Sequence, residues 1–310
     1  MSSAATPNAA PAAAADAASA TAAEPQWKPA DYRSRIKPIW CPGCGNYGFL
    51  TALMRSLAEQ GIDPKDLAII SGIGCSSRLP GFVRSYAFHG VHGRALPVAL
   101  GVKLGNPRLK VIVVGGDGDG LSIGAGHFPH VTRRNIDLTY FLLDNRIYGL
   151  TKGQTSPTTP EGGWTKTAPL GVLESPMNPV GLAIAYGATF VARCYTAKLK
   201  EMQDLITQAM EHKGFSVLQV MTRCVTFGKS CGFDQIDNVL DPIPADHDLH
   251  DARAAFTLVD EREKLYTGVF YRGERPEFVE SLRSIGAAHG RDLDGSAPKI
   301  DVERVIKRFS

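Results

Sequence analysis

The sequence predicts an α/β fold with a doubly wound, mainly parallel sheet. The first support is a set of short, continuous apolar runs at residues 67–70, 111–114, 138–143 and 217–220, with a weaker run at 189–192. Such runs are typical of strands buried on both faces, as in parallel sheets. The second support is the helical spacing of apolar residues between these runs, because strands that alternate with helices indicate a doubly wound sheet.

Helical spacing predicts three helices in this alternation, at residues 48–60, 178–186 and 196–212. The second of them begins with Asn178 as a capping residue and Pro179 in the first turn, an order that favours a helix start. A further helix is expected at 123–133, where Pro129 should kink or shorten it.

Composition divides the 310 residues into three parts. Residues 1–26 form an Ala-rich tail that we expect to be disordered. Residues 27–241 form the main domain, and residues 242–310 form a C-terminal extension that packs on this domain or on a partner. The formal net charge of +3 gives no argument for nucleic acid or a membrane surface. Since no apolar run approaches the roughly 20 residues that span a bilayer, we expect a soluble, cytoplasmic protein.

Polar residues directly follow four of the predicted strands. Cys75, Asp117, Asn145 and Cys224 come after the first, second, third and last of the strong apolar runs. In open α/β sheets, ligands bind outside the carboxyl ends of the strands. The sequence therefore predicts an active site at this edge of the sheet.

The glycine-rich turn after the second strand has the composition of a phosphate-binding loop. Gly116 and Gly118 would let the backbone approach a phosphate closely, and the following helix would present its N-terminal amides. Asp117 between them suits a phosphate only if a divalent cation lies between the two charges. Mg²⁺ prefers six oxygen ligands and often keeps substrate phosphates among them. Read alone, Gly-Asp-Gly is more often an ordinary turn.

Asn145 ends the next strand, 28 residues after Asp117. Its amide oxygen and the carbonyl oxygen of Ile147 are two further oxygens for a metal. Gly-Asp-Gly followed at this distance by an Asn resembles the thiamine diphosphate motif, and that resemblance implies that Asp117, Asn145 and Ile147 hold Mg²⁺. We expect Asp119 to be a turn residue of the cofactor loop, and Asp144 a local hydrogen-bonding residue.

Six cysteines are present: Cys41, Cys44, Cys75, Cys194, Cys224 and Cys231. In a large chain of this kind, metal ligation is favoured over a disulfide framework. Four thiolates suit either Zn²⁺ or a [4Fe–4S] cluster. Structural zinc sites usually pair two Cys-x-x-Cys knuckles, and Cys41 to Cys44 is a single one, which favours a cluster.

Together the motifs resemble the β subunit of the 2-oxoacid:ferredoxin oxidoreductases, most closely the 2-oxoglutarate branch. The resemblance spans about residues 30–275. It rests on Trp-Cys-Pro-Gly-Cys-Gly (40–45), Gly-Ile-Gly-Cys-Ser-Ser (72–77), His-Gly-Val-His-Gly-Arg-Ala-Leu-Pro (89–97), Gly-Asp-Gly (116–118) and Asp-Asn-Arg-Ile-Tyr-Gly-Leu-Thr-Lys-Gly-Gln (144–154).

The resemblance implies that residues 27–241 form a domain that binds thiamine diphosphate and one [4Fe–4S] cluster. The cluster ligands are then Cys41, Cys44, Cys75 and Cys224. Cys231 is a rival for the fourth place, and Cys194 is expected to be a buried thiol. Residues matched to the cofactor site besides the metal ligands are Gly74, Ser76, His92, Gly116, Gly118 and Asp119.

Three residues are candidates for contacting the substrate. Arg78 could hold a substrate carboxylate bidentately, and Leu150 and Lys152 match family positions near the substrate or coenzyme A. His89 and His92 are either histidines without a function, hydrogen-bonded or exposed to solvent, or they line the thiamine pocket or a proton path. The Thr/Pro/Gly-rich segment 155–176 is either a loop that covers the site or an ordinary surface excursion.

The family's reaction is the oxidative decarboxylation of a 2-oxoacid, with coenzyme A as acyl acceptor and ferredoxin as electron acceptor. In that family the Glu that activates thiamine belongs to an α subunit, so an αβ or α₂β₂ assembly is implied. A non-oxidative thiamine-dependent carboligase or decarboxylase remains an alternative, as does a zinc-binding assembly subunit. Pyruvate or indolepyruvate could replace 2-oxoglutarate.

Overall fold

A computed structural model describes residues 27–230, 236–261, 263–289 and 307. The tail 1–26 and the rival ligand Cys231 lie outside the described residues. In the described part of the chain, no helix is both long and apolar enough to cross a membrane.

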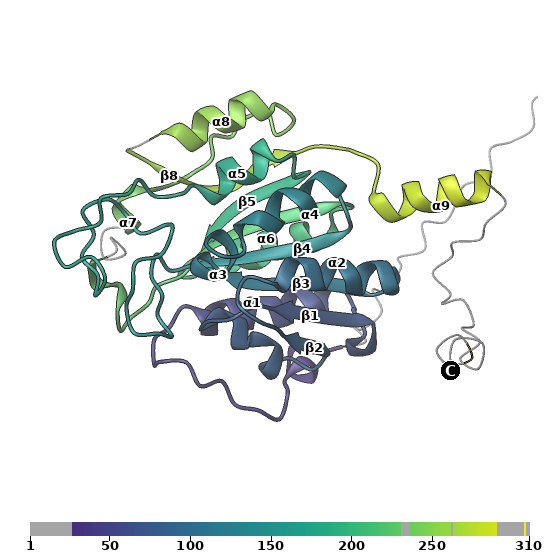
Figure 1. The fold of residues 1–310 in the computed structure, drawn as a ribbon, viewed down its shortest axis with the longest axis horizontal. Coiled ribbons are helices and arrows are strands. Elements are labelled where there is room, and N and C mark those ends of the chain that lie inside the picture. Colours follow the sequence, from purple (N-terminus) through teal and green to yellow (C-terminus); the bar gives the residue numbers. More distant parts are fainter. Residues whose placement is uncertain (1–26, 231–235, 262, 290–306, 308–310) are drawn as a thin grey trace, which may run out of the picture.

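A mainly parallel sheet of eight strands forms the centre of the molecule, in the order β2-β1-β3-β4-β6-β5-β8-β7 (Figure 1). The strands from β2 to β5 in this order are all parallel, and β8 pairs antiparallel to β5. The predicted fold class is confirmed. The strands are β1 (Leu67–Ser71), β2 (Tyr86–His89), β3 (Lys110–Gly116), β4 (Leu138–Asp144), β5 (Phe190–Tyr195), β6 (Phe215–Met221), β7 (Leu240–Pro242) and β8 (Leu265–Arg272).

Helices cover both faces of the sheet (Figure 1). One face is covered by α1 (Asn46–Glu59) and α6 (Leu199–Glu211), which pack on each other. The opposite face carries α2 (Ala95–Gly105), α4 (Phe128–Arg134) and α5 (Pro179–Ala185), with α8 (Ala252–Asp260) against α5. The other α-helices are α3 (Asp117–Leu121), α7 (Ile236–Val239) and α9 (Phe278–Ala288), and the short 3₁₀ turns are Pro29–Tyr32, Pro64–Asp66, Ser76–Phe82, Ala125–His127 and Gly228–Ser230.

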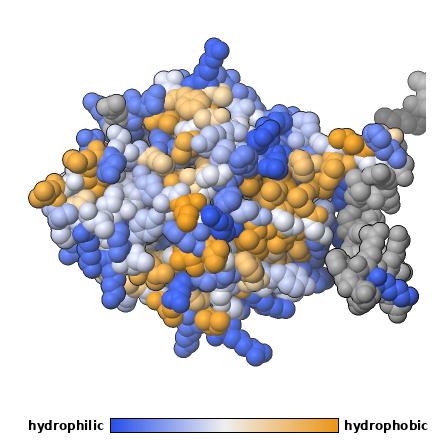
Figure 2. Space-filling view, viewed as in Figure 1, coloured by the Kyte–Doolittle hydropathy of each residue, from blue (hydrophilic) through white to orange (hydrophobic). Residues whose placement is uncertain are grey.

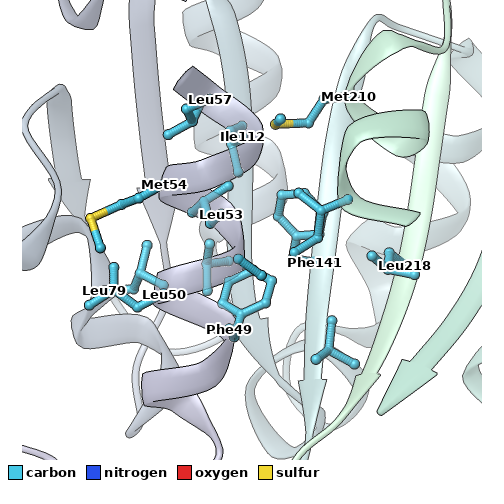
Figure 3. Close-up of a cluster of buried hydrophobic side chains, with 14 of the residues drawn as sticks. Phe49, Leu50, Leu53, Met54, Leu57, Leu79, Ile112, Phe141, Met210 and Leu218 are labelled. Carbon is cyan, nitrogen blue, oxygen red and sulfur yellow. The ribbon is translucent and has the colours of Figure 1, made fainter. Parts of the chain in front are cut away.

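The helical repeat of α1 is the reason that this helix lies on the sheet. Phe49, Leu53 and Leu57 are completely buried and face apolar side chains of β3 and β4 (Figure 3). The rings of Phe49 and Phe141 meet edge to face, 5.3 Å apart. Burying a side chain of this size contributes about 1.5–3 kcal/mol. The helix consequently fixes the loop of Cys41 and Cys44, which precedes it.

Two local predictions about helices are confirmed. The side chain of Asn178 caps α5 by accepting hydrogen bonds from the amides of Val180 and Gly181. Pro129 lies in the first turn of α4, where its missing amide costs no intrahelical hydrogen bond. The helix is therefore shortened to Phe128–Arg134, and a 3₁₀ turn precedes it.

The strand order places the predicted site residues side by side. Strands β1, β3, β4 and β6 are consecutive neighbours in the sheet, and Cys75, Asp117, Asn145 and Cys224 follow their carboxyl ends in that order. Four loops thus meet at one edge.

The sheet continues into the C-terminal part of the chain. Strand β8 extends it beyond β5, and α9, at the right of Figure 1, follows β8. The segment between β8 and α9 is held by Asn135, whose side-chain amide donates to the carbonyl oxygen of Arg275 at 2.9 Å.

Candidate functional site

Two adjoining cavities lie at the edge where the four loops meet. The first has a volume of about 410 Å³ and the second about 350 Å³. Both are lined by Cys75, Asn145, Gly149 and Leu150, so these residues separate the two spaces. The predicted cofactor residues that line the first cavity are Gly74, Cys75, Ser76, His92, Gly116, Asp117, Gly118, Asp119, Asn145 and Ile147.

Asp117 begins α3 directly after β3 and is almost fully buried, with 2% of its surface exposed. The hydroxyl of Thr158 lies 2.8 Å from its Oδ2 atom. Burial, and next the neighbouring Asp144 carboxylate, raise the pKa of Asp117 to about 7. A divalent cation at this position would reverse that effect, because it stabilises the ionised carboxylate. The environment of Asp117 thus fits a residue that is paired with a cation.

A side chain at position 118 has no room. A Cβ atom on Gly118 would lie 2.4 Å from the ring of Tyr148, and the Tyr148 hydroxyl donates to the carbonyl oxygen of Gly118 at 2.9 Å. The glycine lets the loop after β4 close over the loop after β3.

The loop after β4 brings two more of the predicted metal-binding residues to the first cavity. Asn145 lines both cavities, and its Oδ1 atom accepts a hydrogen bond from the amide of Ile147 at 3.1 Å. Ile147 is 3% exposed and lines the first cavity. The structure therefore brings Asp117, Asn145 and Ile147 to one space; their role as metal ligands stays a prediction.

Asp119 holds three loops together, a larger role than that of a turn residue. Its Oδ1 atom accepts from the amides of Ile73 and Gly93 at 2.9 and 2.7 Å. The same atom lies 2.9 Å from Nδ1 of His92. Because these partners follow β1 and β2 and Asp119 follows β3, the carboxylate fixes the wall of the first cavity.

The two histidines that sequence reasoning singled out have different surroundings. His92 lines the first cavity. Its Nδ1 atom donates to the Asp119 carboxylate, which leaves Nε2 as the acceptor nitrogen of the neutral ring. His89 lies at the end of β2, with Nδ1 3.0 Å from the hydroxyl of Ser71, and is absent from the lining of both cavities.

The second cavity is lined by four cysteines from three separate loops, Cys41, Cys44, Cys75 and Cys224. A Cβ atom on Gly149 would lie 3.4 Å from the sulfur of Cys224 and 3.7 Å from that of Cys75, so this glycine lies close to both sulfurs. The amide of Gly45 donates to the carbonyl oxygen of Arg223 at 3.4 Å and joins the first loop to the last. Cys194 is completely buried on β5, as expected.

The surroundings of Cys75 and Cys44 raise the pKa values of both thiols. Burial first, and then the nearby thiols, raise the pKa of Cys75 to about 11, while Arg78 opposes the rise. A bound metal would supply the positive charge that keeps the Cys75 sulfur deprotonated. Within the described residues, no three His, Cys, Asp or Glu side chains lie close enough together to hold a single metal ion.

The three predicted substrate-contacting residues all line the second cavity. Arg78 and Lys152 are exposed, and Leu150 is 45% exposed and lines both spaces. Lys152 has a left-handed backbone with φ of 80°, and its amide donates to the carbonyl oxygen of Gly149 at 3.1 Å. Such a conformation is strained in a residue other than glycine, and it persists where the surroundings over-determine it.

Thr158 was not predicted from the sequence. The turn at residues 156–159 is buried against the loop after β4, although the rest of segment 155–176 is largely exposed and lines neither cavity. Serine and threonine in a loop are too common to single out one hydroxyl.

Sequence reasoning also missed two polar residues in buried strands, Arg193 on β5 and Gln219 on β6. A charged or amide side chain within an apolar strand is visible in the sequence and could have identified both residues.

Two family models match the chain. Residues 72–220 match the thiamine pyrophosphate enzyme C-terminal TPP-binding domain. Residues 224–286 match the C-terminal region of the pyruvate ferredoxin oxidoreductase beta subunit.

Full-length relatives settle the family. The 2-oxoacid:ferredoxin oxidoreductase subunit beta of Saccharolobus solfataricus is 43% identical over 290 residues, which cover 86% of this chain and 95% of the relative. This chain belongs to the β subunits of the 2-oxoacid:ferredoxin oxidoreductases. Another β subunit relative, the 2-oxoglutarate synthase subunit KorB of Methanothermobacter thermautotrophicus, is 39% identical over 84% of this chain and 92% of its own length.

A solved structure of the family has the same fold as this β subunit. It is the 2-oxoglutarate:ferredoxin oxidoreductase from Magnetococcus marinus with 2-oxoglutarate, coenzyme A and succinyl-CoA bound. The two chains are 44% identical with a TM-score of 0.84, and the match covers 92% of this chain and 97% of that one.

Proposed function

We propose that this β subunit binds thiamine diphosphate, Mg²⁺ and one [4Fe–4S] cluster, and oxidatively decarboxylates 2-oxoglutarate together with an α subunit. The acyl group passes to coenzyme A, and ferredoxin accepts the electrons. Relatives named for 2-oxoglutarate and a neighbouring structure that holds 2-oxoglutarate and coenzyme A support this substrate pair.

The observation that carries the proposal is the adjacency of the two cavities. One is lined by Asp117 and its glycines, the other by four cysteines, and Cys75 and Asn145 line both. Bound thiamine diphosphate supplies the carbanion that attacks the keto carbon and the electron sink for decarboxylation. A redox cluster in the second cavity would be separated from thiamine diphosphate in the first cavity only by the residues that line both, so electrons would travel a short path.

In the first cavity, Asp117, Asn145 and the carbonyl of Ile147 would hold Mg²⁺, which would offset the negative charge of the diphosphate. All three contribute oxygen, which is the ligand type that Mg²⁺ prefers. Gly74, Ser76, His92, Gly116, Gly118 and Asp119 form the walls of the cofactor cavity, and we assign to Nε2 of His92 the role of a proton acceptor.

In the second cavity, the lack of any compact group of three metal ligands among the described residues supports a cluster over zinc. Thiolates around one Zn²⁺ stand within about 4 Å of one another, because each Zn–S bond is about 2.3 Å long. Each thiolate of a [4Fe–4S] cluster binds a different iron, so its ligands stand farther apart. Four cysteines line a cavity of about 350 Å³, and no three described His, Cys, Asp or Glu side chains could hold one metal ion, which favours the second arrangement.

Residues at the rim of the second cavity are suited to anionic substrates. Arg78 and Lys152 place two cations beside Leu150, and a guanidinium can bind a carboxylate through two parallel hydrogen bonds. We assign Arg78 to a substrate carboxylate, and Leu150 and Lys152 to the substrate or coenzyme A.

Exposed apolar surface supports an association with an α subunit. Strand β2 ends the sheet with all four of its residues exposed, and Tyr86 and Phe88 are 61% and 49% exposed. Apolar side chains also gather over α2 (Figure 2). Proteins normally cover an apolar sheet edge, and large apolar patches mark interfaces. The partner would supply the Glu that activates thiamine.

The test is the metal content of the chain purified without oxygen together with its α subunit. We expect about four iron and four sulfide per chain, and 2-oxoglutarate as the preferred acid when several 2-oxoacids are offered with coenzyme A. Zinc, or no metal, in protein that still binds thiamine diphosphate would overturn the redox assignment in favour of a non-oxidative carboligase. Preference for pyruvate would overturn only the substrate.

A further inference from the structure

We propose that Thr158 positions the Asp117 carboxylate for its metal and thereby couples cofactor loading to the docking of segment 155–177. A buried relay of Asp144, Gln219 and Arg193 holds the Thr158 hydroxyl in place. The inference rests on the proposed function in one respect: it takes Asp117 to be a metal ligand.

The relay is a series of short polar contacts across three neighbouring strands. Arg193 donates from Nε to Oε1 of Gln219 at 2.7 Å, and Gln219 donates from Nε2 to Oδ2 of Asp144 at 2.7 Å. The Thr158 hydroxyl lies 2.7 Å from Oδ1 of Asp144 and 2.8 Å from Oδ2 of Asp117. These contacts connect β5, β6 and β4 to Asp117, which follows β3.

Because the side chains of the relay are buried, the loss of any one of their hydrogen bonds should lower stability. Arg193, Gln219, Asp144 and Thr158 are at most 4% exposed. A buried cation requires compensation by a nearby negative charge or by hydrogen bonds. Arg193 donates to the carbonyl oxygen of Tyr266 and to Gln219, and through Gln219 it faces the charge of Asp144. The amide of Gln219 fits because it accepts at one end and donates at the other.

The relay makes Asp144 a fixed anchor for Thr158. A second hydrogen bond, from the amide of Arg146 at 3.0 Å, holds Oδ1 of Asp144 from its own loop. The Thr158 hydroxyl lies 2.7 Å from one carboxylate and 2.8 Å from the other, and because it has a single proton it donates to one of them at a time. The carboxylate of Asp117 therefore takes its orientation from a residue 41 positions away.

Thr158 also belongs to the turn that attaches segment 155–177 to the site. The hydroxyl of Thr159 donates to the carbonyl oxygen of Arg146 at 2.7 Å. The amide of Met177 donates to the carbonyl oxygen of Pro157 at 2.8 Å, which closes the segment at its far end. Between these points, Leu170 and Leu173 are 100% and 88% exposed. A change in the order of the Asp117 side chain would therefore change the order of segment 155–177, which carries the exposed Leu170 and Leu173 side chains.

The experiment compares Thr158→Val, Thr158→Ala and Thr158→Ser in the complex with the α subunit. The Mg²⁺ dependence of thiamine diphosphate binding is measured by calorimetry, and protection of segment 155–177 by hydrogen exchange with and without Mg²⁺ and thiamine diphosphate. Loss of a residue that orients a metal ligand typically costs about 10–100-fold in metal affinity. We expect such a loss in the Val and Ala variants, with no cofactor-induced protection, and rescue of both readouts in the Ser variant.

Thr132→Val is the matched control, because Thr132 is a completely buried threonine whose hydroxyl donates to Phe128 at 2.7 Å, on α4. It should leave both readouts unchanged. If Thr158→Ala binds Mg²⁺ as the parent does while Asp117→Asn does not, the inference fails and the proposed metal site stands. If Asp117→Asn also binds Mg²⁺ normally, the proposed metal site itself is wrong.

Discussion

The Asp119 carboxylate accepts a hydrogen bond from Nδ1 of His92 at 2.9 Å, and this contact fixes the tautomer of a histidine that lines the first cavity. The same oxygen accepts from the amides of Ile73 and Gly93. One buried acid thus has two effects: it closes three loops around the cavity, and it takes the hydrogen of Nδ1, so that Nε2 is the nitrogen of a neutral His92 ring that can accept a hydrogen bond.

The variant His92→Asn separates these effects. Its side-chain amide can still donate to Asp119, but it has no group that replaces Nε2. Since a positioned acid or base typically contributes about 10²–10⁴-fold to a rate, we expect kcat to fall by that factor, with thiamine diphosphate affinity within a few-fold of the parent. Steady-state kinetics and calorimetry check this. Unchanged kcat would assign His92 to the wall alone.

Gly118→Ala should damage the first cavity. The new methyl group meets the Tyr148 ring at 2.4 Å, so one of the two loops must move. Overpacking of this kind costs about 1–3 kcal/mol, and we expect that loss in urea unfolding together with weaker thiamine diphosphate binding. Gly101→Ala, on α2, is the control, since nothing lies within 4 Å of its added Cβ atom. Equal effects of the two changes would contradict this prediction.

The stability of the chain should fall as the pH drops toward 5.5, in part through His212. Burial, and next Arg272, lower the pKa of His212. The unfolded chain then takes up the proton more readily than the folded chain, beginning near the ordinary histidine pKa of about 6.5. The contribution of His212 to stability is complete above that pH and is lost below it. Urea unfolding between pH 7.5 and 5.5 should show a shallower decline for His212→Gln; an equal decline in both proteins would exclude this residue.

The sheet edge was predictable because its signals are local. Each apolar run ends within a few residues of a chemically distinctive residue, and the parallel arrangement brings these ends together. Strand β2 gave no such signal, because all four of its residues are exposed and it is not a buried apolar run.

Contacts between distant segments explain which residues could not be predicted from the sequence. Thr158 meets Asp117 across 41 positions, and Gln219 meets Asp144 across 75. No short-range pattern specifies such pairs. Asp119 was undervalued for the same reason: its partners Ile73 and His92 are 46 and 27 residues away, so it was taken for a turn residue of its own loop.

Replacing Cys224 tests whether the second cavity holds the cluster. Cys224→Ser keeps the size of the side chain but removes a thiolate from a set of four that line one cavity. We expect iron and sulfide content, and activity with ferredoxin, to fall by at least tenfold, while thiamine diphosphate still binds to the separate Asp117 loop. Cys194→Ser is the matched control, because Cys194 is completely buried on β5 and does not line the cavity. It should retain its iron and lose only stability. Full iron content in Cys224→Ser would mean that another group supplies the fourth ligand, and the cysteine at position 231 would be replaced next.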